Sequence, residues 1–506
     1  MAFVLIGFMG AGKSTVAAQL ATTLGGRALD SDTLLEEHLG HSIAHEFESR
    51  GEASFRASEE RIVCRLLADA GPRDAVALGG GSVLSEAVRA ALAEHLTLLL
   101  DIDPALAWER VQASSEGVER PLARDFDAFA ALHAERREIY EGLADAVLLW
   151  AESPSGRAYP VLIGRGLLSR GNGRRLAEIW PLDRSRSRPF LVSDRTVSEL
   201  YAPRLEEVLN GEGSSEAAPI AIAPGEPHKT LASAEHVWSE LVRAGMTRSD
   251  HLVALGGGVV GDLAGFCAAT YQRGVPVVHI PTTLVAQVDS AYGGKTGIDL
   301  PAAKNYVGAY HQPAAVLVDP DTLATLPAAE LAAGWVEVLK TALIAGGELW
   351  ERVRDSSGCE VDERTIVACA ATKLAIVAAD ERDAGARQVL NLGHTVGHAI
   401  ETVTGYSRYR HGEAVGLGLL AALALSGAED LRAQVRELLQ ARNLPVSFER
   451  ASVDIEQVLT AVARDKKRLG TGGVPFVLLS EPGEPRIGCE VSDSELRQAV
   501  TELSES

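Results

Sequence analysis

Cysteine is scarce in this chain: its 506 residues include five, at positions 64, 267, 359, 369 and 489. No two of them form a C-x-x-C pair, so the sequence predicts neither a disulfide framework nor a thiolate zinc site. Few, scattered cysteines are typical of a reducing compartment, and we expect a cytoplasmic protein. The first residues have no basic segment ahead of an apolar stretch, so no signal peptide is expected.

Basic residues and long apolar runs are scarce as well. The chain has 48 Lys and Arg against 69 Asp and Glu, which gives a net charge of −21. Such a surface repels phosphate backbones and anionic lipid, so we expect no binding to nucleic acid or membrane. The longest run without a charge, residues 414–428, is shorter than the roughly 20 residues that span a bilayer, and it predicts a buried core helix. Small-molecule substrates remain as partners, and anionic ones require local basic clusters.

Apolar patterning divides the chain into an α/β part and a mostly helical part. Residues 151–157 form a polar, turn-rich linker, and residues 181–189 and 211–219 form loops. Up to about residue 320, short buried strands alternate with helical stretches such as Ser14–Leu24, which predicts parallel sheets. We place domains at 1–152, 153–326 and 327–506. The predicted strands are Phe3–Ile6, Ala75–Leu78, Leu96–Leu100, Phe190–Ser193, His251–Leu255, Val277–Ile280 and Ala315–Val318.

A phosphate-binding motif lies between the first predicted strand and helix. Gly7-Phe-Met-Gly-Ala-Gly-Lys-Ser14 fits G-x-x-x-x-G-K-[ST] in the strand-to-helix context that the motif requires. Backbone N–H groups of such a loop surround phosphate oxygens, the lysine neutralises the transferred phosphoryl group, and the serine holds Mg²⁺. The sequence therefore predicts a site for ATP with Mg²⁺. Its loop residues are Gly10, Ala11, Gly12, Lys13, Ser14 and Thr15.

Polar residues that follow the loop indicate the phosphate acceptor. In their order and spacing they resemble shikimate kinase over roughly residues 1–150. The resemblance implies that Asp30 positions Mg²⁺ through water and that Asp32 contacts the acceptor hydroxyls and draws off a proton. It implies that Arg56 and Arg136 pair with the shikimate carboxylate, as a planar guanidinium can. Gly80 would approach the ring hydroxyls through its backbone.

The resemblance also implies a lid. Arg120 would lie on a mobile segment that closes over the phosphates and excludes water. The family often has an arginine about seven residues earlier, stacked on adenine, but this chain has Ala113 there. Arg110, one helical turn before Ala113, is the candidate substitute.

A second set of motifs begins with a strand that runs into glycines. Gly256-Gly-Gly258 follows His251–Leu255, which suits a pyrophosphate beside backbone amides, although the pattern is not G-x-G-x-x-G. Downstream, lysines lie among glycines around Gly293-Gly-Lys295-Thr and Lys304-Asn305. Such a basic cluster in an acidic chain indicates a phosphate or carboxylate pocket.

Histidines later in the chain indicate a metal. His394 and His398 are spaced i and i+4, so they share one helix face, and His411-Gly-Glu413 follows closely. A set of two histidines and a carboxylate suits a catalytic Zn²⁺ with an open coordination position. Spacing alone favours both His394 and His398 as ligands.

Together these motifs resemble 3-dehydroquinate synthase over roughly residues 157–506. The matching segments are GGGVVGD, PTTL, VDS-x-x-GGKTG, KN, E-x-x-K, R-x-x-LN-x-GHT-x-GH and HGEAV. The resemblance implies that Glu337, His394 and His411 bind Zn²⁺ or Co²⁺ and that His398 faces the substrate. The implied reaction cyclises 3-deoxy-D-arabino-heptulosonate 7-phosphate to 3-dehydroquinate and releases phosphate, with NAD⁺ recycled.

The resemblance assigns further residues to the substrate and to NAD⁺. The substrate contacts would be Arg273, Lys295, Lys304, Asn305, Lys373, Arg387 and His398, braced by Asp289, Lys340 and Asn391. The NAD⁺ contacts would be Asp194, Glu226, Lys229, Gly257, Gly258, Asp262, Thr282, Thr283 and Thr325. The groups expected to act in catalysis are Lys13, Asp32, Arg120, Lys295, Lys340, Arg387 and His398. The chain departs from the family at Ala291-Tyr292, where small residues are usual, and at Asp299, where asparagine is frequent.

The predicted fold class is α/β: a P-loop kinase-type sheet, a Rossmann-like NAD-binding domain and a mostly helical metal-binding domain. The leading hypothesis is a bifunctional enzyme of the shikimate pathway. One alternative keeps the synthase and makes the P-loop half a nucleotide-sensing module. Another makes the larger half a metal-dependent polyol dehydrogenase or a cyclase for a different sugar phosphate. A homodimer through the synthase half is implied by the resemblance only.

Overall fold

The computed structural model describes residues 1–114, 125–152, 158–169, 180–184, 186–209, 218–301, 303–449, 453–468 and 476–505. These residues belong to two compact units. The first unit consists of Met1–Trp150, Pro160–Pro189 and Pro203–Glu216, and the second of Ala151–Tyr159, Phe190–Ala202 and Ala217–Ser506. The α/β and helical parts of the larger half thus lie in one unit, and a domain boundary at 326 stays a prediction.

The first unit is built on parallel strands in the order β2-β3-β1-β4-β5. The strands are β1 (Phe3–Ile6), β2 (Ala28–Asp30), β3 (Ala75–Ala77), β4 (Leu96–Leu99) and β5 (Ala146–Ala151), and β6 (Tyr159–Ile163) follows. The helices are α1 (Lys13–Leu24), α2 (Ser31–Leu39), α3 (Ile43–Asp69), η1 (Ser82–Leu84), α4 (Glu86–Leu92), α5 (Pro104–Ser114) and α6 (Phe126–Leu143). The predicted strands and helix of this unit are confirmed to within one residue at each end.

β1 lies in the middle of this sheet, and all four of its residues are buried. The chain goes from β1 to β2 on one side of the sheet and reaches β4 on the other, so the carboxyl end of β1 lies at the switch point where α/β proteins bind ligands. The turn that leaves β1 needs glycine, because a Cβ on Gly7 would lie 2.4 Å from the carbonyl oxygen of Leu100. The phosphate motif is therefore placed by the topology of the sheet.

The α/β part of the second unit has strands in the order β13-β10-β9-β7-β8. Neighbouring pairs β13–β10, β10–β9 and β7–β8 are parallel. The strands are β7 (Pro189–Asp194), β8 (Ile220–Ile222), β9 (His251–Gly256), β10 (Val277–Pro281) and β13 (Ala315–Val318), and a separate hairpin joins β11 (Lys295–Leu300) to β12 (Ala303–Tyr310). The helices are α8 (Arg195–Leu209, whose residues from Pro203 on are assigned to the first unit), η2 (Glu226–His228), α9 (Leu231–Arg243), α10 (Gly258–Thr270), η3 (Tyr271–Arg273), η4 (Ala286–Ser290) and η5 (Pro320–Thr325).

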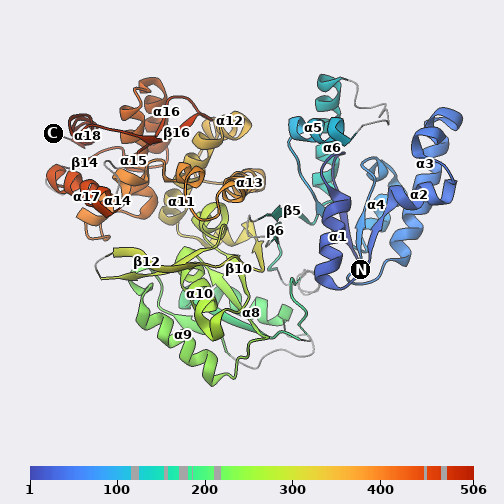
Figure 1. Ribbon diagram of the computed structural model, residues 1–506, viewed down its shortest axis with the longest axis horizontal. Coiled ribbons are helices and arrows are strands. Elements are labelled where there is room, and N and C mark those ends of the chain that lie inside the picture. Colours follow the sequence, from blue (N-terminus) through green and yellow to red (C-terminus); the bar gives the residue numbers. More distant parts are fainter. Residues whose placement is uncertain are drawn as a thin grey trace. The chain divides into compact units, whose positions relative to one another are not determined.

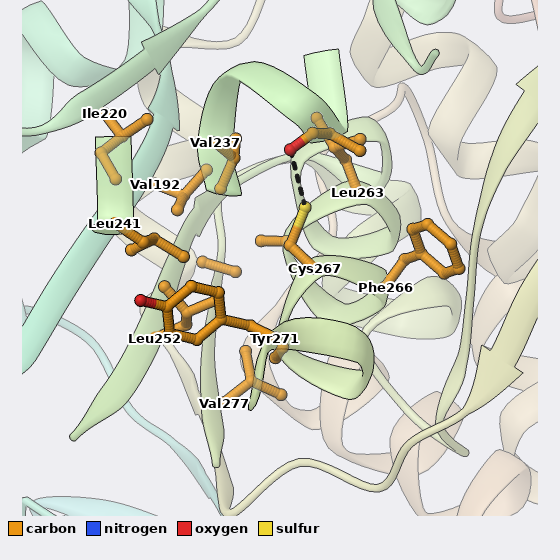
Figure 2. Close-up of a cluster of buried hydrophobic side chains, with 14 of the residues drawn as sticks. Val192, Ile220, Val237, Leu241, Leu252, Leu263, Phe266, Cys267, Tyr271 and Val277 are labelled. Carbon is orange, nitrogen blue, oxygen red and sulfur yellow. Dashed lines mark hydrogen bonds between the residues drawn. The ribbon is translucent and has the colours of Figure 1, made fainter. Parts of the chain in front are cut away.

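A buried apolar cluster fixes this part of the unit. Figure 2 shows Val192 and Leu252 from neighbouring strands meeting Leu241 of α9 and Leu263 of α10. Cys267 lies in the same cluster, its thiol directed at the backbone of α9, and burial raises its pKa to about 12. Since α10 starts directly after β9, this packing also fixes the glycines at the carboxyl end of β9.

The remaining described residues form the helical part, which gathers at one side of the second unit in the golden to red colours of Figure 1. Its helices are α11 (Ala328–Ala345), α12 (Gly347–Asp355), α13 (Glu363–Ala379), η6 (Ala386–Asn391), α14 (His394–Val403), α15 (His411–Leu425), α16 (Glu429–Gln440), α17 (Ile455–Arg468) and α18 (Asp493–Glu502). Short strands also occur: β14 (Phe448–Glu449), β15 (Phe476–Leu479), β16 (Pro485–Cys489) and β17 (Ser504–Glu505).

The apolar run at 414–428 lies mostly in α15, where it is buried as predicted. Within the described part of the chain, we find no helix whose length and apolar character would let it cross a membrane.

The predicted α/β class and helical half are confirmed, whereas the β11–β12 hairpin was not predicted.

Two candidate active sites

The phosphate loop of the first unit leads from β1 into α1. Gly10 and Gly12 have φ angles of 83° and 87°, in the left-handed region that favours glycine. Lys13 Nζ donates hydrogen bonds to the carbonyl oxygens of Gly7 and Phe8 at 2.9 and 3.0 Å. The ammonium group thus lies against the loop beside the first N–H groups of α1, where a phosphate binds most favourably.

Ser14 and Asp30, the predicted magnesium pair, lie in contact. Ser14 Oγ donates a hydrogen bond to Asp30 Oδ2 at 2.5 Å. Asp30 is also the N-cap of α2 and accepts hydrogen bonds from the N–H groups of Asp32 and Thr33. The cap fixes this carboxylate at the end of β2, and a hydroxyl beside a carboxylate provides the oxygen ligands that Mg²⁺ prefers.

The residues predicted to bind the phosphate acceptor meet at the glycine turn after β3. An ideal Cβ on Gly79 would lie 2.4 Å from Asp32 Oδ1, and one on Gly81 would lie 2.3 Å from Arg56 Nη1. Both side chains therefore approach the turn only because it consists of glycine. Arg56 is held there by Glu59, whose carboxylate is 2.7 Å away and buried.

Arg136 reaches the same turn from α6. The carbonyl oxygen of Gly80 accepts hydrogen bonds from Tyr140 Oη at 2.6 Å and from Arg136 Nη1 at 3.5 Å. Burial raises the pKa of Tyr140 to about 12, so this phenol stays protonated and donates. The fold therefore brings one carboxylate and two guanidinium groups to a single turn, an arrangement suited to a hydroxylated carboxylic acid.

The nucleotide side of this site is described only in part. Arg120 lies outside the described residues. The helix that carries Arg110, α5, packs against the phosphate loop, because a Cβ on Gly10 would lie 2.7 Å from the carbonyl oxygen of Ala107. Arg110 Nη1 lies 3.5 Å from the carbonyl oxygen of Gly10, whereas Ala113 is exposed.

In the second unit, the residues predicted to bind NAD⁺ follow the carboxyl ends of the sheet strands. The carboxyl ends of parallel strands share one edge, and the chain order changes direction between β7 and β9, which is where such folds bind ligands. Gly257 and Gly258 start α10 at this edge, and a Cβ on them would lie 2.8 Å from Thr283 and 2.9 Å from Ser290. The edge is thus a glycine cradle of the kind that admits a pyrophosphate. The other predicted residues at or after strand ends are Asp194, Glu226, Lys229, Thr282 and Thr325.

Lys229 joins the acids of this edge. Its side chain is 3% exposed, and Nζ lies 3.0 Å from Glu226 and 3.2 Å from Asp262. Burial would lower the pKa of Lys229, but the surrounding carboxylates raise it instead. Burial raises the pKa of Asp262 to about 6, although Lys229 opposes this shift. A buried cation therefore fixes the carboxylates that are predicted to meet the nucleotide.

The predicted metal ligands converge from three helices. Glu337 of α11, His394 of α14 and His411 of α15 each offer one ligand atom, and these atoms lie within 4.8 Å of one another. Glu337 Oε1 is 3.7 Å from His394 Nε2 and 3.3 Å from His411 Nε2. Two imidazoles and a carboxylate at these distances fit a tetrahedral divalent metal with one open position.

Glycine allows this approach. A Cβ on Gly412 would lie 1.8 Å from the carbonyl oxygen of Ala333 in α11, so the first turn of α15 touches α11 directly. A Cβ on Gly418 would likewise lie 1.9 Å from the carbonyl oxygen of Gly393, which precedes α14. Close packing at these glycines brings His394 and His411 to the carboxylate of the third helix.

Burial and neighbouring charges shift the pKa values of all three triad residues. Burial would raise the pKa of Glu337, but Lys340 and the two histidines hold it well below its usual range. Burial, with Lys340, lowers the pKa of His394 to about 3, so its imidazole is neutral, the form that binds a metal. Burial would lower the pKa of His411 too, but hydrogen bonds to Glu337 and Glu401 raise it to about 10.

Buried lysines extend from the triad toward the sheet. Lys340 Nζ lies 2.6 Å from Glu337 Oε2 and 3.9 Å from Asp289 Oδ1. Lys373 Nζ lies 2.8 Å from the same Asp289 oxygen and donates a hydrogen bond to its backbone carbonyl. Burial lowers the pKa of Lys373, although Asp289 opposes this shift. Asp289 thus contacts both lysines, and the bracing roles of Asp289 and Lys340 stay predictions.

A second basic group lies at the turn before β11. Arg387 is buried and donates hydrogen bonds to the carbonyl oxygens of Gly293 and Glu381, at 3.1 and 2.6 Å. Lys295, at the start of β11, pairs with Asp383 at 2.5 Å and is half exposed. Arg387 therefore supports the turn that carries Lys295.

His398 and Glu401 complete the site on α14. His398 is exposed, and its ring centroid lies 5.1 Å from that of His394 and 5.9 Å from that of His411. Glu401 is buried and lies 3.3 Å from His411 Nδ1 and 3.3 Å from Lys304 Nζ. A carboxylate on the far nitrogen of a metal-binding histidine fixes its tautomer and orientation. Glu401 was not among the predicted residues, although its position three residues after His398 places it on the same helix face.

Family models match both halves of the chain. The model described as 3-dehydroquinate synthase N-terminal matches residues 219–333, and the corresponding C-terminal model matches residues 334–468. A 3-dehydroquinate synthase of Gloeobacter violaceus is 41% identical over 357 residues, which cover 68% of this chain and 96% of that protein. The chain belongs to the 3-dehydroquinate synthase family. The shikimate kinase model matches residues 9–162, so the chain is a fusion of a shikimate kinase domain with a 3-dehydroquinate synthase.

One further relative has the same name, and two solved structures of other synthases are similar to the chain. A 3-dehydroquinate synthase of Legionella pneumophila is 38% identical over 371 residues, 71% of this chain and 98% of that protein. The solved structure of 2-epi-5-epi-valiolone synthase from Streptomyces hygroscopicus, with NAD⁺ and Zn²⁺ bound, is 26% identical with a TM-score of 0.59, covering 68% of this chain and 96% of that one. A structure of 2-deoxy-scyllo-inosose synthase, complexed with carbaglucose-6-phosphate, NAD⁺ and Co²⁺, shares the fold at 23% identity, with a TM-score of 0.61 and coverage of 70% and 99%.

Two further predicted residues of the synthase half are exposed. Arg273 is exposed in η3, beyond the carboxyl end of α10, whose other end starts at the glycine cradle. A helix of 13 residues is about 20 Å long, so Arg273 lies far from the glycine cradle along α10, and its part in substrate binding stays a prediction. Asn391 is exposed at the end of η6, three residues before His394.

Proposed function

We propose that this chain catalyses two reactions of the shikimate pathway. The first unit transfers the γ-phosphoryl group of ATP to shikimate. The second cyclises 3-deoxy-D-arabino-heptulosonate 7-phosphate to 3-dehydroquinate and releases phosphate. The observation that carries the synthase proposal is the convergence of Glu337, His394 and His411 beside a buried lysine cluster and a glycine cradle.

The residues of the second unit fit both cofactors of the proposed synthase. When bound, NAD⁺ takes up and returns a hydride, and a Zn²⁺ or Co²⁺ ion polarises the hydroxyl that is oxidised. Glu337, His394 and His411 would hold the metal. The cradle at Gly257 and Gly258 would hold the pyrophosphate, and the other strand-end residues would contact the rest of the nucleotide.

The substrate is an anion at both ends, and the side chains around the triad match it. Lys295, Lys304 and Lys373 would bind the carboxylate and the phosphate as point charges, with Asn305 beside them. Arg387 would align the turn before β11. His398 is exposed next to the metal ligands, so its imidazole would hold or move a proton at the substrate.

In the kinase unit, the loop residues from Gly10 to Thr15 would hold the triphosphate, with Mg²⁺ at Ser14 and Asp30. Asp32 would accept the proton of the attacking hydroxyl. Arg56 and Arg136 would bind the carboxylate and so fix which hydroxyl faces the γ-phosphate. In this proposal Arg120 closes the site as a lid residue.

One set of assays separates this proposal from its alternatives. With the linear phosphorylated keto acid, NAD⁺ and Zn²⁺, the chain should form one phosphate for each 3-dehydroquinate and no net NADH. Accumulating NADH would indicate a polyol dehydrogenase, and phosphate without 3-dehydroquinate would indicate another cyclase. With Mg²⁺ and ATP, ADP formation should require shikimate; ATP binding without shikimate-dependent turnover would indicate a nucleotide-sensing module.

We also propose a cytoplasmic location, which the scattered thiols at five positions support. The substrates are small molecules, and the net charge of −21 disfavours nucleic acid as a partner. A homodimer through the synthase half remains part of the proposal. Light scattering of the purified chain would test it.

A further inference from the structure

One residue, Asp299, connects the β11–β12 hairpin to the edge of the sheet that is predicted to bind NAD⁺. We call this edge, with Glu226, Lys229 and Asp262, the nucleotide edge. Its backbone N–H donates a hydrogen bond to the carbonyl oxygen of Lys229 at 2.7 Å. Its Oδ1 accepts a hydrogen bond from the N–H of Asn305 at 2.8 Å and lies 3.8 Å from Lys229 Nζ. The register of the hairpin shifts between Ile298 and Leu300, so Asp299 sits at an irregularity in the ladder. The residue thus connects both strands of the hairpin to the loop that follows β8.

The hydrogen bond from the N–H of Asn305 to the carboxylate of Asp299 holds Asn305 in an unfavourable backbone conformation. Asn305 has a φ angle of 55°, in the left-handed region that a non-glycine residue occupies at a cost. In this conformation its side-chain Oδ1 accepts a hydrogen bond from Lys229 Nζ at 2.7 Å. Asp299, Asn305 and Lys229 therefore form a closed set of contacts, in which each residue touches the other two.

Lys304, next to Asn305, connects this set to the metal site. Its ammonium group lies 3.3 Å from Glu401, which contacts the metal ligand His411, and 3.6 Å from Glu226, which contacts Lys229. The conformation of the hairpin at residue 305 therefore determines the position of the Lys304 ammonium group, which is a predicted substrate contact. Contacts run without a gap from the nucleotide edge through the hairpin to the metal ligands.

We propose that Asp299 is a positioning residue that couples the nucleotide edge to the substrate-binding hairpin. This inference rests on the proposed synthase function. Asp299 lies near Lys229, which pairs with the carboxylates that are predicted to face the nucleotide. Through the N–H of Asn305, it holds the hairpin in the shape that presents Lys304 and Asn305 to the substrate. The essential feature is the acceptor oxygen at Oδ1, which asparagine also offers and alanine lacks.

The test compares Asp299→Ala with Asp299→Asn in the full-length chain. Loss of a hydrogen bond of this kind corresponds to about a tenfold effect, so Asp299→Ala should raise KM for the keto acid phosphate by about tenfold. It should also weaken NAD⁺ binding, measured by calorimetric titration, and speed hydrogen exchange in the β12 peptide. Asp299→Asn should stay within about twofold of the parent chain in all three measurements.

Two controls distinguish a failure of this inference from a failure of the proposed synthase function. Asp430→Ala, at an exposed carboxylate of α16, should change none of the three measurements. Shikimate kinase activity of the same chain should be unchanged in every variant, which checks folding and concentration. Equal effects of alanine and asparagine, or an unaffected Asp299→Ala, would overturn the inference while the parent chain still makes 3-dehydroquinate. A parent chain that makes none would instead overturn the proposed function, while NAD⁺ titration and hydrogen exchange would still test the coupling.

Discussion

Replacing Glu401 with glutamine should weaken metal binding without disturbing the fold. Glu401 is 3% exposed, and its two oxygens serve different partners: Oε2 accepts from His411 Nδ1, and Oε1 pairs with Lys304. Burial would raise the pKa of Glu401, but the hydrogen bond from His411 and nearby positive charge lower it to about 2. The group is therefore a carboxylate at any working pH, and glutamine removes its charge while it keeps the shape and one acceptor.

The expected loss of metal affinity follows from the contact between His411 and Glu401. Removing the partner of a metal-binding histidine typically costs about 10–100-fold in metal affinity. The distance of 3.3 Å between His411 Nδ1 and Glu401 Oε2 is long for a charged hydrogen bond, so we expect the lower end. A tenfold loss corresponds to about 1.4 kcal/mol. Lys304 loses an ion-pair partner in the same variant, so KM for the keto acid phosphate should change as well.

Competition between the chain and a chromophoric chelator for Zn²⁺ measures this affinity directly. Glu429→Gln, an exposed carboxylate that pairs with Arg432 on α16, is the matched control and should bind Zn²⁺ like the parent chain. Shikimate kinase activity should be equal in all three proteins. Unchanged Zn²⁺ affinity in Glu401→Gln would refute the argument that this carboxylate orients His411.

Three further predictions concern buried charges and close contacts. Lys340→Met leaves the carboxylate of Glu337 without its cation at 2.6 Å, so the free energy of unfolding of the second unit should fall by about 3–5 kcal/mol in denaturant titrations. Gly81→Ala places a methyl group 2.3 Å from Arg56 Nη1, so KM for shikimate should rise while KM for ATP stays constant. The Asp74 carboxyl accepts a side-chain hydrogen bond from Arg27, which lowers the pKa of Asp74 to about 2. Its stabilising contribution is therefore present above pH of about 4 and lost as the pH falls toward 2; Asp74→Asn should flatten the dependence of the melting temperature on pH in this range.

Each of these predictions has a control or an outcome that would contradict it. For Lys340→Met, the first unit should unfold at the same denaturant concentration as in the parent chain, and a loss below about 1 kcal/mol in the second unit would contradict the argument. Gly142→Ala adds a methyl group with no atom within 4 Å, so it should leave both KM values unchanged. An equal pH dependence in Asp74→Asn and the parent chain would show that Asp74 does not carry the acid sensitivity.

Local motifs could be predicted from sequence because their function lies in consecutive residues. The phosphate loop is one turn between one strand and one helix, so its spacing determines its geometry. The buried strand Phe3–Ile6 and the apolar helix α15 are likewise set by local pattern. The pair His394 and His398 shows the limit: both share a helix face, yet Glu337 is brought in by the packing of α11, which no spacing encodes.

Contacts between distant segments explain what the sequence did not predict. In the sequence, Glu401 is an ordinary helix carboxylate, because its contact with His411 depends on how α15 packs. The β11–β12 hairpin was missed because its strand residues are mostly polar, glycine or exposed, so it shows no buried apolar run. Arg273 follows the carboxyl end of α10 in η3, and its place among the substrate contacts stays a prediction.

The central claim is that one polypeptide has two chemically independent active sites. The direct test measures both reactions on the same purified preparations of Lys13→Ala and His411→Ala. Lys13→Ala should lose shikimate phosphorylation and keep phosphate release from the keto acid, and His411→Ala should show the reverse. Equal loss of both activities in either variant would contradict the claim.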